Sequence, residues 1–318
     1  MATPVGVNAV NSLSRRILHP QLIDNVYQSG PLFARLVALN KKMLQGGYQI
    51  EVPQVYSRFA AGGPFQGFDV LDISPSDTVK NAAWDWRQYY VPVTVDELTL
   101  ARWDHPEAVA SGLTFLFEQA EAEMYENLVT GCWSDAVTNT KSIDGLKGAV
   151  DDGTVATTYG GLSRTANPWW KGQIDTTTTT LTTISMRTIV GNCTVGGRHP
   201  TVIFTTQFIY NRYWNLIQPN QAWPIQPAGA DEQKAQAGFT NLIFDGVPII
   251  VDSHVPANHL FYLNERYLYL FVKTGWDMKL NDFIQPPNQF VYTSLLAWFG
   301  QLVLANPARS GKQTAITG

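Results

Sequence analysis

The chain has 318 residues, which is enough for one large domain or two smaller ones. Charged residues make up 15% of it, below the average of about 25% for globular proteins, and this favours a protein that buries much of its surface, within itself or against copies of itself. The net charge of −4 argues against a nucleic-acid-binding domain that relies on a basic surface.

Cysteine usage and hydropathy narrow the class further. Cys132 and Cys193 have no metal-binding spacing and do not form a disulfide framework, which is typical of a protein made in the cytoplasm. No run of about 18 apolar residues predicts a membrane-spanning helix. Residues 1–10 lack the apolar core of a signal peptide. We therefore expect no membrane partner.

Residues 1–45 are predicted to form an arm. The first thirty residues hold too few apolar side chains to fold alone, so they must dock on the same chain or on another. Apolar residues recur at helical spacing from Leu32 to Met43. The arm carries an excess of positive charge over its one acidic residue, Asp24, in Arg15, Arg16, Arg35, Lys41 and Lys42. Such an arm would suit DNA, an acidic partner or a neighbouring subunit, and a solvated helix face is the alternative.

Residues 46–103 are predicted to form an extended hairpin. Strand-like alternation in 48–55 follows Gly46-Gly47, and a second extended run covers 84–100. The intervening stretch, 57–81, is rich in glycine and turn residues, and loops of this length are usually functional. It carries three phenylalanines, Phe59, Phe65 and Phe68. A partner surface would bury these rings, whereas the alternative is a loop folded back on its own core.

A long amphipathic helix is predicted from Pro106 to Thr130. Apolar residues fall three and four positions apart on one face, and five glutamates, Glu107, Glu118, Glu121, Glu123 and Glu126, are assigned to the other. Asp104 is placed to cap the first turn, and Gly131 to end the helix. At about 1.5 Å per residue the helix would be roughly 37 Å long.

The remaining chain alternates short strands with helices. The stretch 159–173 contains Asn167-Pro168-Trp169-Trp170, and the paired tryptophans also suggest a carbohydrate platform as an alternative. A helix is predicted over 181–192, with Leu181, Ile184, Thr188 and Ile189 inward. We further predict a strand over 201–204, a helix capped by Thr205 or Thr206, a loop over 218–238, a hairpin over 242–251 turning at Asp245-Gly246, and strands over 260–263, 267–271 and 290–304. The fold class is α+β.

The sequence carries no recognisable catalytic motif. The sequence has no phosphate-binding glycine loop followed by Lys-Ser/Thr, and no GxSxG elbow. Asp252, His254 and His259 are a weak metal-site pattern that we interpret as a solvated turn. We expect no catalytic residue, no cofactor and no metal.

Several segments, taken in order, resemble the major capsid proteins of tailed bacteriophages, of the HK97-like fold type. The residues that carry the resemblance are Gly46 to Pro53, Tyr159 to Asp175 with its Gly-Gly and tandem Trp, Phe244 to Ile250, Tyr262 to Asn264, and Trp298 to Leu302. Each motif is weak alone, but their order, with a long helix between the hairpin and the tandem Trp, is more specific.

The resemblance implies a domain plan: an N-terminal arm (1–45), an extended loop (46–103), a peripheral domain with a spine helix (104–180), an axial domain (181–275), and a return to the peripheral domain (276–318). It also implies a self-assembling icosahedral shell, in which Phe59, Phe65, Phe68, Trp169 and Trp170 contact neighbouring subunits. Scaffolding, portal and decoration proteins would be further partners, and the basic arm would contact packaged DNA weakly. Removing 57–81 should then leave a folded subunit that does not assemble. An encapsulin, a bacterial compartment shell of the same fold, and a carbohydrate-binding virion protein are the alternatives.

Overall fold

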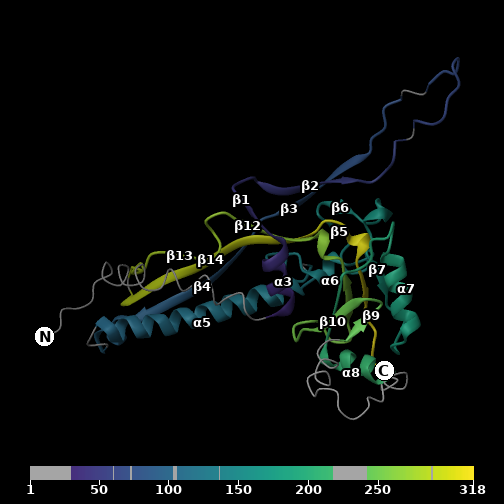
Figure 1. Cartoon of the computed structure of the whole chain (residues 1–318). Helices are drawn as coiled ribbons and strands as arrows, with labels where there is room; N and C mark the ends of the chain where they lie inside the picture. The colour runs from purple at the N-terminus through teal and green to yellow at the C-terminus, as the bar shows by residue number, and fades with distance from the viewer. Residues whose placement is uncertain are drawn as a thin grey trace, which may run out of the picture.

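A computed structural model describes residues 30–59, 61–71, 74–102, 106–135, 137–217, 242–287 and 289–318. In this part of the chain two sheets lie side by side, a long helix runs along the first of them, and a hairpin projects from the body (Figure 1). The α+β class predicted from the sequence is confirmed.

The first sheet has the strand order β1-β12-β14-β13, and β4 also pairs with β14. Its strands are β1 (Lys41–Leu44), β4 (Arg87–Asp96), β12 (Leu268–Lys273), β13 (Lys279–Leu280) and β14 (Val291–Leu304). The antiparallel β4–β14 ladder runs over ten residues, from Arg87 opposite Gly300 to Asp96 opposite Val291. In β4, Val91, Val93 and Val95 are buried while the residues between them are exposed, so one face of the sheet is covered.

Helix α5 (Pro106–Cys132) covers that face and confirms the predicted spine helix (Figure 1). Its buried residues include Val109, Leu113, Phe117, Met124 and Leu128. The predicted end was wrong, because Gly131 lies inside the helix and Asp104 lies outside the described residues. A Cβ on Gly131 would lie 2.6 Å from the Tyr89 hydroxyl oxygen and 3.0 Å from Ile143 Cγ1, so this glycine permits close packing. The short helix α4 (Glu97–Arg102) precedes α5.

One glutamate expected on the solvent face of α5 is buried. Glu121 is only 6% exposed, and burial, with a smaller effect of Glu118, raises its pKa to about 7 from an ordinary 4.5. Because its pKa is raised in the folded subunit, the charged form of Glu121 disfavours folding. The free energy of unfolding therefore falls as the pH rises from 4.5 through 7, and below pH 4.5 this carboxyl does not change it.

We therefore expect Glu121→Gln to stabilise the unassembled subunit by about 2 kcal/mol at pH 8 and by almost nothing at pH 4. Urea unfolding at the two pH values measures this. Glu123→Gln, an exposed neighbour on the same helix, should change stability by less than about 0.5 kcal/mol at either pH. An equal gain from Glu121→Gln at both pH values would contradict the burial of an ionisable carboxyl.

The described part of the arm packs on its own chain. Helix α3 (Pro31–Asn40) is shorter than predicted, because Met43 belongs to β1 rather than to the helix. Arg35 makes a two-pronged ion pair with Glu265, at 2.7 and 2.9 Å. Lys41 pairs with Asp277, and the Lys42 ammonium lies 4.0 Å from the centre of the Tyr269 ring. Arg15 and Arg16 lie outside the described residues.

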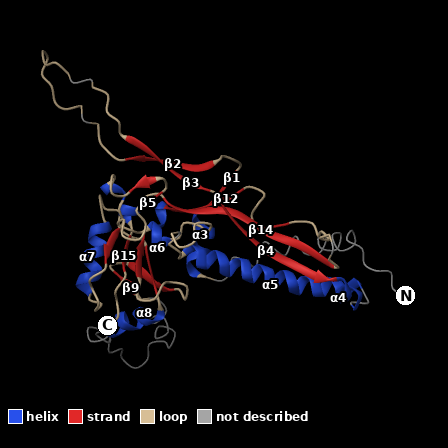
Figure 2. Ribbon diagram, turned by 180° about the vertical axis from the view of Figure 1, so that it is seen from behind, coloured by secondary structure: helices blue, strands red, loops and turns tan. Residues whose placement is uncertain are grey.

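The second sheet has the order β7-β15-β11-β8-β10-β9. Its strands are β7 (Gln173–Asp175), β8 (Val202–Thr205), β9 (Ile243–Phe244), β10 (Val247–Val251), β11 (Leu260–Leu263) and β15 (Gly311–Gln313). Every residue of β8 and β11 is buried, as in a central pair of strands covered on both faces. Helices α7 (Thr183–Cys193) and α8 (Gln207–Ile217) flank this sheet (Figure 2).

Two details of the predicted helices were wrong. Thr182 and Ser185 form a capping box for α7. Leu181 and Ile189 are buried as predicted, but Ile184, expected inward, is 78% exposed, and Met186 and Val190 complete the buried face. For α8, neither threonine hydroxyl caps the helix: Thr205 donates to the His259 carbonyl, and the Thr206 hydroxyl has no partner among the described residues.

The turn between β9 and β10 is confirmed, with φ of 50° at Asp245 and 80° at Gly246. The loop predicted over 218–238 lies outside the described residues. Two strands of the second sheet, β7 and β15, lie outside the predicted axial range 181–275, whereas β12 lies inside that range and belongs to the first sheet. Smaller elements among the described residues are α6 (Leu146–Ala149), β5 (Thr158–Tyr159), β6 (Leu162–Ser163) and the 3₁₀ turns η1 (Pro168–Trp170), η3 (Glu265–Tyr267) and η4 (Pro307–Arg309).

Strands β2 (Gln49–Val55) and β3 (Val79–Asp85) form the projecting hairpin. Their antiparallel register runs from Gln49 opposite Asp85 to Val55 opposite Val79, which confirms the extended hairpin. The run predicted as one strand over 84–100 is three elements, because the ladder breaks at Trp86, β4 then joins the first sheet, and α4 begins at Glu97.

Candidate subunit interface

The tip of the hairpin exposes its apolar side chains. Phe59 is 77% exposed, Phe65 67% and Phe68 104%, and Val70 beside them is 98% exposed. No described residue between 57 and 77 belongs to the buried hydrophobic core. The alternative of a loop folded back on its own core is therefore wrong. Several exposed apolar side chains on one projecting segment are typical of an interaction surface.

The polar contacts of the tip are local. The Gln66 amide donates to Asp69 Oδ2 at 2.8 Å, and the Asp69 amide donates to the Gln66 carbonyl at 2.7 Å, which makes a closed turn within the tip. This turn shapes the described tip locally, and the phenylalanine rings of the tip face solvent.

The base of the hairpin is anchored in the core by aromatic packing. Trp84 is 2% exposed and packs on Tyr159, at 5.5 Å between ring centres, and on Trp170, at 6.4 Å. Gly160 has a φ of +55°, and a Cβ there would lie 2.7 Å from the Trp84 ring, so the β5–β6 turn needs glycine to approach the hairpin.

The structure separates the two tandem tryptophans. Trp170 is 1% exposed, and its indole N–H donates to the Tyr159 carbonyl at 2.9 Å, so it offers no surface to a neighbour. Trp169 is half-buried and stacks on Tyr56, at 5.7 Å between ring centres. The pair does not form a flat exposed platform for a sugar ring.

A buried ion cluster, absent from the sequence prediction, holds the segment after α6 to the C-terminal strand. Asp151 is fully buried, with the Lys312 ammonium 3.1 Å from Oδ1 and the Arg164 guanidinium 3.6 Å from Oδ2. Arg164 also donates to the carbonyls of Gly148, Ala149 and Ala156. Burial acts to raise the pKa of Asp151, but N–H donors, with Ala156 first, and the Lys312 ammonium outweigh it, so the pKa of Asp151 is lowered.

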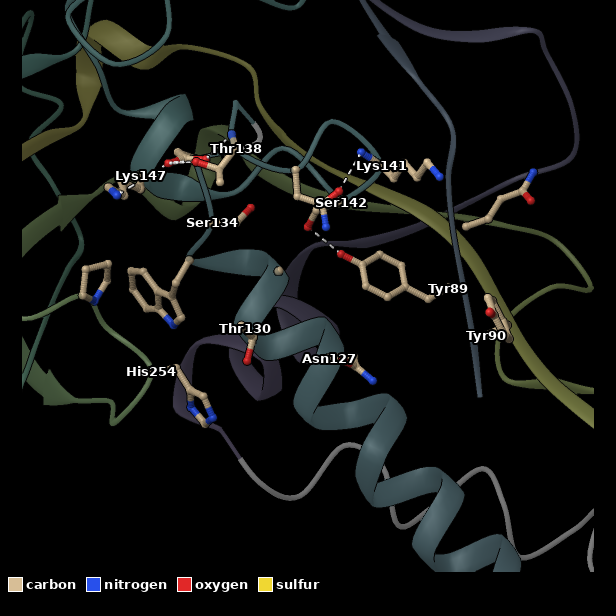
Figure 3. A pocket seen from close by; sticks show the side chains of 16 residues that line it. Tyr89, Tyr90, Asn127, Thr130, Ser134, Thr138, Lys141, Ser142, Lys147 and His254 are labelled. Carbon is tan, nitrogen blue, oxygen red and sulfur yellow. Dashed lines mark hydrogen bonds and ion pairs between the residues drawn. The ribbon is translucent and has the colours of Figure 1, made fainter. Parts of the chain in front are cut away.

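An open cleft of about 770 Å³ lies beside the C-terminal end of α5 (Figure 3). In it the Tyr89 hydroxyl contacts the Ser142 hydroxyl at 2.7 Å and accepts from the Ile143 amide. The His254 ring links Glu126 on α5, at 2.8 Å, to Asp252, at 3.2 Å. These groups bond to one another, which is the pattern of a structural joint between the spine helix and the turn after β10.

The described residues hold no group of three or more His, Cys, Asp or Glu side chains placed to bind a metal ion. Both cysteines are buried, and burial raises the thiol pKa of Cys132 and, to about 12, that of Cys193. Neither thiol is therefore a ready nucleophile at neutral pH. In the same part of the chain, no helix is both long and apolar enough to cross a membrane.

Comparison with solved structures identifies the architecture. The capsid subunit of cyanophage A-1(L) matches with a TM-score of 0.60 and 17% identity, covering 91% of this chain and 93% of that one. The procapsid of satellite phage P4 matches with a TM-score of 0.55 and 11% identity, covering 98% and 96%. The chain has the HK97-like capsid fold.

The HK97-like fold is shared by shells of different kinds. The encapsulin of Synechococcus elongatus matches with a TM-score of 0.55 and 12% identity, covering 88% of this chain and 86% of that one. No protein-family model and no curated protein matches the sequence. At these identities the comparisons establish the fold, and the function is argued from the exposed surfaces.

Proposed function

We propose that this protein is the major capsid protein of a tailed phage. It assembles into the pentamers and hexamers of an icosahedral shell that encloses the DNA genome. The observation that carries the proposal is the hairpin tip, whose exposed phenylalanines a single subunit leaves in water. A closed shell covers such a tip with the next subunit around each symmetry axis.

The domain plan follows from the same proposal. Residues 1–45 are the arm, 46–103 the extended loop, 104–180 with 276–318 the peripheral domain, and 181–275 the axial domain. The protein resides in the virion after assembly in the host cytoplasm, and its role is structural rather than catalytic. Scaffolding, portal and decoration proteins are its further partners.

The basic arm has a restricted part in DNA contact under this proposal. Arg35 and Lys41 are already paired with carboxylates of their own chain, so the described arm leaves Lys42 as its most exposed cation. Packaged DNA is therefore contacted weakly by this surface, and the interaction should weaken with added salt.

An encapsulin is the second candidate, favoured by its match to the same fold. Phage capsids recur among the matches, including those of cyanophage A-1(L), satellite phage P4 and Mycobacterium phage Adephagia, and this supports the phage assignment. Particle contents separate the two. Nucleic acid inside particles purified from lysed infected cells would support the phage shell, whereas an enclosed enzyme in particles without DNA would support the encapsulin.

Replacing the three tip rings tests the interface directly. Because Phe59, Phe65 and Phe68 contact solvent in the subunit, changing all three to Ser should leave its melting temperature within about 2 °C of wild type. Each ring loses about 1.5–3 kcal/mol of burial in the shell, so the yield of closed particles should fall at least tenfold. Particle yield is counted by sedimentation and electron microscopy.

A matched control is Val137→Ser, which changes an apolar residue that is 54% exposed outside the hairpin. It should assemble normally. Wild-type particle yield from the triple variant would rule out the tip as a subunit contact.

A further inference from the structure

The hairpin contacts the body at two levels, and the lower one is buried. Alternate residues of β2 and β3 share a face, so Trp84, Ala82, Lys80 and Tyr56 form one stripe from base to tip on the face turned to the body. At the lower level Trp84 packs on Tyr159 and Trp170, and the Ala83 amide donates to the Gly160 carbonyl at 2.9 Å. This level is part of the core of the subunit.

At the upper level Tyr56, Lys80 and Trp169 are half-exposed, and Asn167 is buried. Lys80 Nζ donates to Asn167 Oδ1 at 2.9 Å, and the same ammonium lies 4.7 Å from the centre of the Tyr56 ring. Tyr56 in turn stacks on Trp169 at an interplanar angle of 21°. Asn167 is held in place by its own donation to the Ser163 carbonyl at 2.8 Å. We call Tyr56, Lys80, Asn167 and Trp169 the upper clasp.

The upper clasp joins the outer end of the β2–β3 ladder to the 158–170 segment. Tyr56 is also the last residue of the β2 limb to bond across, donating its amide to the Thr78 carbonyl at 3.0 Å. Beyond it each limb of the tip is about ten residues, or roughly 33 Å when extended. A rotation of about 15° at the clasp would therefore carry Phe65 and Phe68, near the end of the tip, through roughly 9 Å, about the width of two strands. Phe59, three residues beyond Tyr56, would move by only about 3 Å.

We infer that the upper clasp sets the direction in which the hairpin projects and so determines where its tip meets the neighbouring subunit. The effect of the clasp on assembly rests on the proposed shell function, whereas its effect on the direction of the hairpin does not. The tandem tryptophans then have separate roles: Trp170 completes the core, and Trp169 is a positioning residue for assembly. Because Tyr56, Lys80 and Trp169 are half-exposed, the loss of their contacts frees the hairpin without unfolding the subunit.

The test measures hairpin direction in the unassembled subunit. Spin labels are attached at Gly67→Cys in the tip and at Gly191→Cys in α7, where in each case an added Cβ meets no atom within 4 Å. The native Cys132 and Cys193 are buried and do not compete for label. If the clasp fixes the hairpin, the distance between the two labels should have one narrow distribution in the parent protein. The width should at least double in Trp169→Ala and return to the parent value in Trp169→Phe.

A second variant, Lys80→Met, removes the bond to Asn167 while keeping a long side chain, and should broaden the distribution less than Trp169→Ala. Melting temperatures of all these variants should stay within about 2 °C of the parent, which separates positioning from folding. Unchanged distance distributions in both Trp169→Ala and Lys80→Met would overturn the inference.

Assembly distinguishes failure of the clasp from failure of the proposed function. Trp169→Ala should give fewer closed shells and more irregular particles than wild type, and Trp169→Phe should restore them. If Trp169→Ala broadens the distance distribution but the wild type never assembles, the clasp is supported and the shell function is contradicted. If Trp169→Ala keeps a narrow distance distribution and forms normal shells, only the inference about the clasp is contradicted.

Discussion

Removing the hairpin tip is expected to leave a folded subunit that forms no closed shells. The change replaces residues 58–76 by Asn-Gly, which joins Ser57 to Asp77 through a two-residue turn of the kind that suits antiparallel strands. None of the described residues in the excised stretch lies in the hydrophobic core, so the melting temperature should move by no more than a few degrees. The β2–β3 ladder and the upper clasp stay intact.

The measurement is sedimentation velocity with negative-stain microscopy, on the shortened protein beside wild type. Subunits or small rings without shells are the expected result. This design is sharper than excising 57–81, because residues 79–81 pair with β2 and their loss would damage the ladder itself. Closed particles of normal size from the shortened protein would contradict the role of the tip.

The second large effect is expected at the buried ion cluster. Asp151→Ala leaves the Arg164 guanidinium and the Lys312 ammonium buried without their carboxylate, and also strips an acceptor from the amides of Gly153, Val155 and Ala156. Breaking a buried pair in this way costs about 3–5 kcal/mol, enough to unfold many domains at body temperature. Urea unfolding of the subunit gives the value.

Asp152→Asn is the matched control, since this neighbour contacts only Thr154 among the bonds described for its side chain, and it should cost less than about 1 kcal/mol. The cluster also has a pH signature. Because the pKa of Asp151 is lowered in the folded protein, its charged carboxylate stabilises the fold at pH values above the ordinary carboxyl pKa. This stabilisation is lost as the pH falls through the pKa of the folded protein. Equal stability of Asp151→Ala and wild type at pH 7 would show that the cluster does not hold the fold.

Sequence patterns predicted those elements whose structure is determined by residues close together in the sequence. The spine helix is long and amphipathic, the hairpin has alternating strands on both sides of a glycine-rich loop, and Asp245-Gly246 carries its own turn chemistry. The sequence left the tip phenylalanines between exposure to a partner and a loop folded back on its own core, because three phenylalanines among glycines have no periodic face.

Features set by contacts distant in the sequence could not be predicted in this way. Asp151 and Lys312 are 161 positions apart, and nothing in the spacing of either residue marks the pair. Gly131 reads as a helix end, yet it is required where Tyr89 and Ile143 pack against the helix. Trp169 and Trp170 are neighbours of the same type, and only the position of Trp84 and Tyr56 gives them different surroundings.

The measurement that tests the central claim most directly is negative-stain electron microscopy of the purified full-length protein, with analytical ultracentrifugation of the same sample. Closed icosahedral particles, or rings of five and six subunits, are the predicted result. A discrete monomer at every concentration, with no assembly when a scaffolding protein is supplied, would contradict the capsid function.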